Sequence, residues 1–285
     1  QTPSQSGDCM DFWTLFPRCA PLIGVVHLRP LPGSPRWGGD WNVVERDARR
    51  DAKALVDAGA DGIIVENFGD VPFYATSVPP TTVAAMTALT RGVREEIGGG
   101  TPIGVNVLRN DAQAALAVAT VAGADFIRVN VHAGAMVTDQ GIVEGRAAET
   151  LRERARLGAT TLIFADIAVK HATPLGGSVP IEELAEETFE RGLADALIVT
   201  GTGTGKQTSQ DDVARVRGAL PAAPVLVGSG ATVDDVGSIV AIADGVIVGT
   251  ALKEDGVVTN PVDTERAAAF FAACPRDERK PRARG

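Results

Sequence analysis

The sequence is short of basic residues, cysteines and long apolar segments, and each shortage excludes a class of protein. Its 36 acidic residues outnumber 27 lysines and arginines, which gives a net charge of −9, and basic residues cluster only in the last few positions. Because nucleic-acid surfaces need clustered lysine and arginine, we expect no nucleic-acid partner. No apolar run of about 18 residues occurs, so we expect no integral membrane segment.

The three cysteines lie near the two ends of the chain, at positions 9, 19 and 274. Their uneven spacing fits neither a disulfide framework nor a zinc site. The first residues also lack a basic region followed by an apolar run, so no signal peptide is expected. These features together predict a protein of the reducing cytoplasm.

Short β-branched runs alternate along the chain with segments of helical spacing. With 285 residues, 45% of them hydrophobic, the chain can form one large α/β domain. Alternating units of this kind predict parallel strands joined by right-handed crossovers, and eight of them favour a TIM-type (β/α)8 barrel over an open doubly wound sheet. The eight expected strands lie within residues 21–28, 61–67, 102–108, 126–132, 161–167, 196–201, 224–230 and 244–252.

Four of these strands follow the same short pattern, a helix end, a Gly/Ala-Asp turn and a buried run, as in AGADGIIVEN and AGADFIRVN. Such recurrence is typical of a barrel built from repeated pairs of units. We expect residues 1–20 to form a lead-in, 21–272 a single-domain barrel and 273–285 a disordered polar tail. Aromatic residues in the lead-in are expected to plug the bottom of the barrel or to cover a partner. We expect segment 133–141 to be a loop and Lys253 to be solvated.

Polar residues are concentrated at the expected strand ends. In the fourth strand, alternation turns Ile127, Val129 and Val131 toward the helices, which sends three polar side chains inward. The inward polar set comprises His27, Glu66, Asn106, Arg128, Asn130, His132, Asp166 and Thr200. All but Arg128 lie near the carboxyl ends of their strands, where barrel active sites are built. The structural alternative is a polar core in which Arg128 pairs with Glu66 or Asp166, because buried charges need partners.

These residues are assigned two expected roles. Acid/base catalysis around the reacting carbons is assigned to His27, Glu66, Asn130, His132, Asp166 and Lys170. Substrate contacts are assigned to Asn106, Arg128, Thr200, Thr202 and Lys206. Lys170 follows the fifth strand, where a lysine beside a carboxylate in a dry pocket can act as acid, base or phosphate clamp, although simple exposure to solvent explains it equally well.

The last two expected strands each end in glycine and a small hydroxyl residue. Glycine at a strand end lets backbone N–H groups approach an anion closely, and in (β/α)8 barrels these two loops often hold phosphate. The predicted phosphate-binding residues are Gly228, Ser229, Gly230, Gly249 and Thr250. The nearby sequence GTGTGKQT, residues 201–208, departs from both the P-loop and GxGxxG patterns, so we interpret it as a substrate-covering loop.

No cofactor motif occurs, and none is expected. His27, His132 and Asp166 are of the types that bind a divalent metal in open catalytic sites. No His-x-His or other close ligand spacing supports such a site, so a metal remains the less favoured alternative.

Several stretches resemble the BtpA family. They include PLIGVVHLRPLPGSP at residues 21–35, RVNVHAGAMVTDQG, DIAVKHA, VTGTGTG and VLVGSGAT, and the resemblance runs from about Met10 to Phe271. It implies a TIM-type barrel, in agreement with the strand count, but it carries over no established catalytic residue.

Two hypotheses of function follow. We favour an enzyme that acts on a small phosphorylated molecule, a sugar phosphate or nucleotide-like sugar, by isomerisation, lyase or glycosyl-bond chemistry, and that forms homo-oligomers as such barrels often do. The alternative is a non-catalytic assembly factor for a membrane complex, because the family is named after a cyanobacterial protein linked to photosystem I biogenesis.

Overall fold

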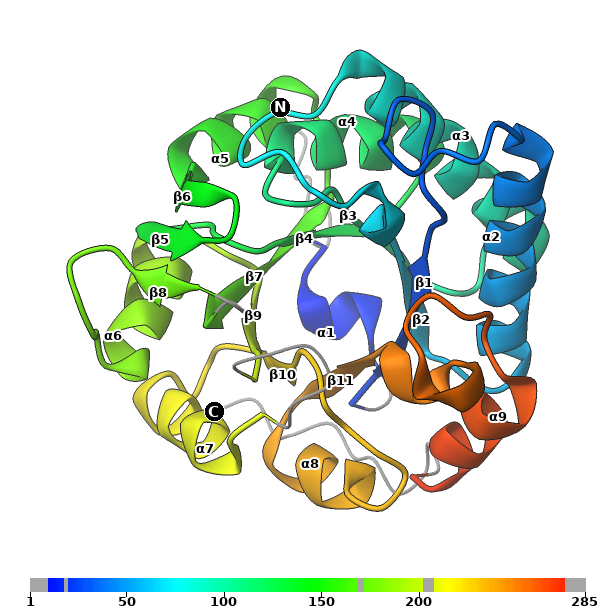
Figure 1. Ribbon diagram of the computed structural model, residues 1–285. Coiled ribbons are helices and arrows are strands. Elements are labelled where there is room, and N and C mark those ends of the chain that lie inside the picture. Colours follow the sequence, from blue (N-terminus) through cyan, green and yellow to red (C-terminus); the bar gives the residue numbers. More distant parts are fainter. Residues whose placement is uncertain (1–9, 18–19, 169–171, 202–207, 275–285) are drawn as a thin grey trace, which may run out of the picture.

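The computed structural model describes residues 10–17, 20–168, 172–201 and 208–274. Its centre is a closed barrel of eight parallel strands surrounded by helices (Figure 1). The strands, in barrel order, are β1 (Leu22–His27), β2 (Gly62–Glu66), β3 (Ile103–Asn106), β4 (Phe126–Val129), β7 (Leu162–Ala168), β9 (Ala196–Val199), β10 (Val225–Val227) and β11 (Gly245–Val248). The predicted (β/α)8 barrel is therefore confirmed, and β1 closes it by pairing with both β2 and β11.

Helices lie on the outside of the barrel, where all but the last connect successive barrel strands and the last one follows the final strand. They are α2 (Trp41–Asp57), α3 (Pro80–Ile97), α4 (Ala112–Ala122), α5 (Ala147–Arg156), α6 (Ile181–Glu186), α7 (Gln210–Ala219), α8 (Val236–Ile242) and α9 (Thr264–Ala272). Short turns of helix are η1 (Phe68–Asp70), η2 (Glu187–Arg191), η3 (Thr250–Leu252) and η4 (Glu254–Gly256). Within the described residues, no helix has both the length and the apolar character needed to cross a bilayer.

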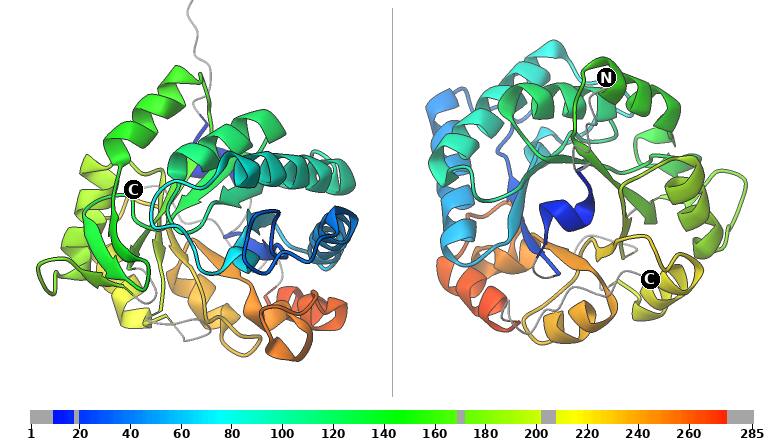
Figure 2. Two further views of the ribbon diagram at one scale, coloured as in Figure 1. Left: turned by 45° about the horizontal axis from the view of Figure 1, so that its top comes forward. Right: turned by 180° about the vertical axis from the view of Figure 1, so that it is seen from behind.

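A short helix, α1 (Phe12–Leu15), lies inside the ring of strands and plugs one end of the barrel (Figure 2). Asp11 caps it by accepting a hydrogen bond from the Thr14 amide. The Phe12 ring packs against Phe164, with centroids 5.6 Å apart, and Phe164 stacks on Phe126 at 4.4 Å. These rings stand at the amino-terminal half of β4 and β7, so the plug closes the bottom of the barrel and leaves the carboxyl ends of the strands open.

The repeated Gly/Ala-Asp turns have a common structural role. Each aspartate directly precedes one of β2, β4, β9 and β11, the second, fourth, sixth and eighth barrel strands along the chain, and accepts a hydrogen bond from a backbone N–H near the start of the barrel strand before it. The pairs are Asp61 with Leu22 (2.9 Å), Asp125 with Ile103 (2.8 Å), Asp195 with Ile163 (2.7 Å) and Asp244 with Val225 (3.0 Å). The sequence repeat therefore corresponds to a repeated hydrogen bond between neighbouring strands at the bottom of the barrel, which we call the aspartate clasp.

Three of these aspartates also bind an arginine. It comes from the helix that precedes the strand whose N–H the aspartate accepts, namely α3 before β3, α5 before β7 and α7 before β10. Arg94 of α3 pairs with Asp125 at 2.7 Å, and Arg154 of α5 pairs with Asp195 at 2.6 Å. Arg217 of α7 pairs with Asp244 in the same way. Each clasp thus ties two neighbouring strands and one helix together.

A small antiparallel sheet, absent from the sequence-based prediction, lies beside the barrel mouth. It contains β5 (Ala135–Thr138), β6 (Gly141–Glu144) and β8 (Thr173–Pro174). The expectation of a loop at 133–141 was therefore wrong, because Met136 and Val143 turn inward and pack with Val131 as a small hydrophobic cluster. The alternation of only four residues per strand is too short to stand out in the sequence.

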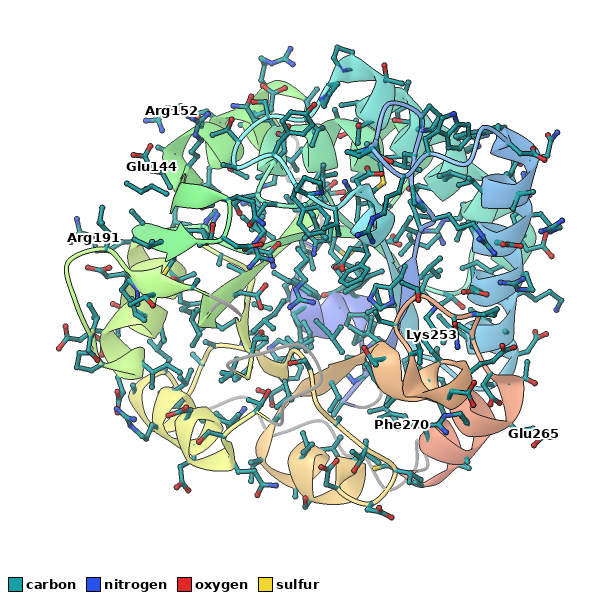
Figure 3. All side chains as sticks on the ribbon, viewed as in Figure 1. Glu144, Arg152, Arg191, Lys253, Glu265 and Phe270 are labelled. Atoms are coloured by element: carbon teal, nitrogen blue, oxygen red, sulfur yellow. The ribbon has the colours of Figure 1, made fainter. Side chains whose placement is uncertain are left out.

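The expectation that Lys253 is solvated was also wrong. The side chain of Lys253, which is labelled in Figure 3, is 1% exposed. Its Nζ lies 2.9 Å from an Asp51 carboxylate oxygen of α2. Burial lowers the pKa of Lys253, while the charge of Asp51 opposes that change. This pair fixes the segment after β11 against α2.

The aspartate clasp at Asp125 should contribute measurably to the stability of the fold. Asp125→Ala removes the hydrogen bond to Ile103 and the ion pair with Arg94, so we expect the free energy of unfolding to fall by about 2 kcal/mol. Asp57→Ala is a matched control, because Asp57 is exposed and pairs only along α2 with Lys53, at 2.7 Å. Urea denaturation of both variants tests this, and equal losses would show that the clasp contributes nothing special.

Candidate functional site

A cavity of about 340 Å³ occupies the open mouth of the barrel. Four strands contribute polar side chains to it, and the loops after β10 and β11 complete its wall. Of the predicted site residues, those lining the cavity are His27, Glu66, Asn106, Arg128, Asn130, Gly228, Ser229, Gly230, Gly249 and Thr250. The volume suits a small ligand.

One side of the cavity carries a carboxylate held by an amide. Asn106, at the end of β3, donates a hydrogen bond to Glu66 Oε2 at 2.7 Å. The second oxygen of Glu66 lies 3.9 Å from His27 Nε2, and the imidazole ring packs against Phe68 with centroids 4.9 Å apart. A carboxylate and an imidazole are thus brought together at the ends of neighbouring strands, as acid/base chemistry requires.

The glycine-rich ends of β10 and β11 form the opposite wall. A Cβ at Gly249 would lie 2.7 Å from His27 Cε1, and one at Gly228 would lie 2.4 Å from Thr200 Oγ1, so neither position has room for a side chain. Gly230 has a φ of 80°, a conformation that favours glycine. The Gly228 amide donates to the Val199 carbonyl at 2.8 Å, so Gly228 provides clearance while its N–H continues the ladder.

Beneath the cavity, Asp166 of β7 binds Arg128 through two parallel hydrogen bonds. Arg128 Nε and Nη2 donate to the two carboxylate oxygens, each at 2.9 Å. Asn130 donates to the same carboxylate at 3.1 Å, and the Thr200 hydroxyl donates to it as well. Burial alone would lower the pKa of Arg128, but the charge and hydrogen bonds of Asp166 outweigh it and raise that pKa. The guanidinium therefore stays charged.

His132 is placed away from this cavity. Its Nε2 lies 2.8 Å from the Gly192 carbonyl, just after η2, and the ring is 1% exposed. The prediction that His132 points inward was wrong because β4 ends at Val129, and alternation along a strand does not continue into the following loop. Burial lowers the pKa of His132 and favours the neutral imidazole.

The remaining predicted residues fall outside the cavity wall or outside the described structure. Asp166 and Thr200 lie beneath the wall, in the network around Arg128. Lys170, Thr202 and Lys206 lie outside the described residues. Within the described part of the chain, no group of three or more His, Cys, Asp or Glu side chains is placed to hold a metal ion, and His27, His132 and Asp166 have separate surroundings.

Four large side chains of the cavity wall were not found from the sequence. Phe68 and Phe73 come from the segment after β2, Arg109 follows β3, and Arg266 extends from α9. Strand alternation gives no signal for residues in loops or on a following helix. The aromatic residues of the segment after β2, Phe68, Phe73 and Tyr74, are the only local hint in the sequence.

The fold and its open mouth define a (β/α)8 barrel with a polar pocket at the carboxyl ends of its strands. The BtpA family model matches residues 18–276, and the chain belongs to this family. It is 46% identical to the "Photosystem I biogenesis protein BtpA" of Synechocystis, over 93% of this chain and 91% of that protein. It is 47% identical to an uncharacterized protein of Pyrococcus furiosus, over 87% and 92%, and 34% identical to the "Putative sgc region protein SgcQ" of Escherichia coli, over 88% and 92%.

Solved structures with the same fold are more distant in sequence. KDPGal superposes with a TM-score of 0.53 at 18% identity, covering 89% of this chain and 93% of that one. Phosphoribosyl anthranilate isomerase of Thermus thermophilus gives 0.53 at 13% identity, covering 89% and 97%. Thiamine phosphate pyrophosphorylase of Pyrococcus furiosus gives 0.53 at 13% identity, covering 90% and 96%. At these identities the likeness shows the fold alone.

The buried His132 predicts a pH dependence of stability. Because its pKa is lower in the folded chain than in the unfolded one, the unfolded chain binds more protons below about pH 6.5. The free energy of unfolding should therefore fall as the pH drops through and below about 6.5. His132→Gln, which can donate to Gly192 but does not titrate, should show a smaller fall. Urea denaturation at about pH 7.5 and about pH 5.5 measures both, and parallel falls would contradict the assignment to His132.

Proposed function

We propose that this chain is an enzyme that acts on a small phosphorylated molecule at the barrel mouth. The observation that carries the proposal is the pair of neighbouring strand ends at Gly228–Gly230 and Gly249–Thr250, which line the cavity and where Gly228 and Gly249 have no room for a side chain. The amides of Ser229, Gly230, Gly249 and Thr250 would bind the phosphate oxygens. Arg128 supports this placement, since its Nη2 is 3.3 Å from where a Cβ of Gly228 would stand.

Glu66 and His27 are the proposed proton-transfer pair. Asn106 fixes one carboxylate oxygen of Glu66 by donating to it at 2.7 Å, which leaves the other oxygen on the side of His27. The two strand ends at Gly228–Gly230 and Gly249–Thr250 are called the phosphate cradle below. A ligand whose phosphate lies on this cradle would place its neighbouring carbons over Glu66 and His27, because His27 touches the same wall at Gly249. This arrangement suits isomerisation, lyase chemistry or glycosyl-bond cleavage, all of which need an acid and a base. Lys170, Thr202 and Lys206 stay proposed as further ligand contacts.

The names of similar barrels are consistent with this proposal. Two of the three solved structures described above are named for phosphorylated compounds, a phosphoribosyl anthranilate and a thiamine phosphate. The shared fold does not by itself transfer their chemistry, because one barrel supports many reactions.

The second candidate is an assembly factor for a membrane complex. The 46% identity to a protein named for photosystem I biogenesis favours it. Such a factor would act through its surface, and it would not need a carboxylate, an imidazole and an arginine buried around one cavity. Ligand binding at that cavity therefore separates the two candidates.

Phosphate binding is the first test. We expect sugar phosphates or inorganic phosphate to raise the melting temperature in a concentration-dependent way, by an amount that corresponds to about 2.7 kcal/mol at a hundred times Kd. Gly249→Ala, whose methyl group would stand 2.7 Å from His27, should lose most of this effect. Gly218→Ala on the exposed side of α7, where a Cβ meets nothing, is the matched control and should keep it. An unresponsive wild-type protein would favour the assembly factor.

Catalysis is tested separately once a turned-over sugar phosphate is identified. Glu66→Gln keeps the hydrogen bond geometry but removes the proton-accepting group, so we expect kcat to fall by at least about a hundredfold while phosphate binding changes little. Steady-state kinetics measures this, and an unchanged kcat would remove Glu66 from the proposed mechanism.

A further inference from the structure

The carboxylate of Asp166 has its hydrogen-bonding capacity filled by protein groups. One oxygen accepts from Arg128 Nε and Asn130 Nδ2, and the other accepts from Arg128 Nη2 and the Thr200 hydroxyl. An ionised carboxylate offers about four acceptor sites, so all of them are occupied. Asp166 is 4% exposed and lies beneath the cavity wall. These contacts make it a positioning residue, in place of the catalytic role that the sequence predicts.

The same contacts fix which atoms of Arg128 and Asn130 are turned toward Asp166 and which are turned away from it. Two of the five N–H groups of Arg128 donate to Asp166, which leaves one N–H of Nη2 and both N–H groups of Nη1 as further donors. Because an ionised carboxylate can only accept, the side-chain nitrogen of Asn130 must face Asp166 and its oxygen must face away. Both residues line the cavity. Asp166 therefore presents a cationic donor and a neutral acceptor side by side.

The side-chain oxygen of Asn130 indicates which kind of ligand the cavity would bind. Asn130 Oδ1 is buried, the residue is 7% exposed, and this oxygen has no hydrogen-bond partner among the described residues. A complex in which a buried polar atom has no hydrogen-bond partner is less stable than one in which that atom is paired. Deprotonated phosphate oxygens only accept hydrogen bonds, so a phosphate can satisfy Arg128 but not Asn130. Asn130 Oδ1 needs a donor from another part of the same ligand.

We infer that the cavity selects a phosphate ester that carries a hydroxyl group, whose O–H donates to Asn130 Oδ1 while the phosphate lies between the cradle and Arg128. This inference rests on the proposed function and narrows it to polyol or sugar phosphates. The buried Ser229 hydroxyl, also without a partner among the described residues, adds one more polar group at the phosphate end of the cavity. A site built to bind a hydroxyl rejects an analogue that lacks it.

The test compares sugar phosphates with alkyl phosphates of the same carbon number, which lack the hydroxyl groups and the sugar ring. Ribose 5-phosphate and glucose 6-phosphate are measured by isothermal titration calorimetry against pentyl phosphate, hexyl phosphate and inorganic phosphate, at a pH where the phosphate esters are dianions and carry no P–OH donor. We expect at least one sugar phosphate to bind on the order of tenfold more tightly than its alkyl counterpart. Equal affinities for the sugar and alkyl phosphates would overturn the inference and leave the phosphate site standing. If none of these phosphates binds, the proposed function fails together with the inference.

Variants assign the preference to Asn130. Asn130→Leu has a similar volume but no acceptor, so it should lose the sugar-over-alkyl preference and keep its affinity for the alkyl phosphates within about threefold. Asn42→Leu, at an exposed position of α2, is the matched control and should bind as the wild type does. A preference that survives in Asn130→Leu would overturn the role of Asn130. Circular dichroism checks folding, and Asn130→Ala serves as a second variant if the leucine is not accommodated.

The positioning role of Asp166 has its own readout. Asp166→Asn should weaken the binding of inorganic phosphate, but this loss should shrink in an Arg128→Lys background, where the two parallel hydrogen bonds are already gone. Additive losses in this double-mutant cycle would mean that Asp166 does not act through Arg128.

Discussion

The paired hydrogen bonds between Asp166 and Arg128 are the interaction on which the polar interior of this barrel depends. Both side chains are buried, and a charge buried without a partner would strongly destabilise the fold. Their pairing at two 2.9 Å contacts, supported by Asn130 and Thr200, lets a barrel interior hold charged groups beneath an open pocket. The remaining atoms of Arg128 and Asn130 are then available to a ligand.

The two ends of the barrel differ in the kind of contacts they contain. At the bottom, the aromatic plug and the repeated aspartate clasps join strands and helices through backbone N–H groups and arginines. At the top, carboxylate, imidazole, amide and guanidinium groups face a cavity, and glycines keep two strand ends free of side chains. Because the clasps hold neighbouring strands in register, they also set the spacing of the groups at the top.

Much of this arrangement could be predicted from the sequence because a parallel barrel obeys simple periodic rules. The eight β-branched runs gave the strands, and alternation within them correctly placed Glu66, Asn106 and Arg128 inside. The rule failed where the strand ended, as at His132, which turns toward Gly192 instead of the cavity. Alternation also cannot distinguish a group that faces a ligand from one that is saturated by neighbours. For that reason alternation predicted a catalytic role for Asp166, whose carboxylate oxygens instead accept hydrogen bonds from Arg128, Asn130 and Thr200.

Residues outside the strands were the least predictable part of the site. Arg109 and Arg266 reach the cavity from a loop and from a helix that follow different strands, so their meeting depends on the closed barrel. The small sheet formed by β5, β6 and β8 joins segments on either side of β7, and its four-residue strands are too short for a periodic signal. Lys253 was misjudged for a related reason, since its partner Asp51 is distant in sequence.

The account places a phosphate group between the strand ends of β10 and β11 and the guanidinium of Arg128. A crystal structure of the protein grown with inorganic phosphate tests this claim directly. We predict phosphate density within hydrogen-bonding distance of the Ser229, Gly230, Gly249 and Thr250 amides, with an N–H group of Arg128 directed toward it. Clear density for these strand ends with no anion between them at saturating phosphate, or an anion bound elsewhere in the barrel mouth, would contradict it.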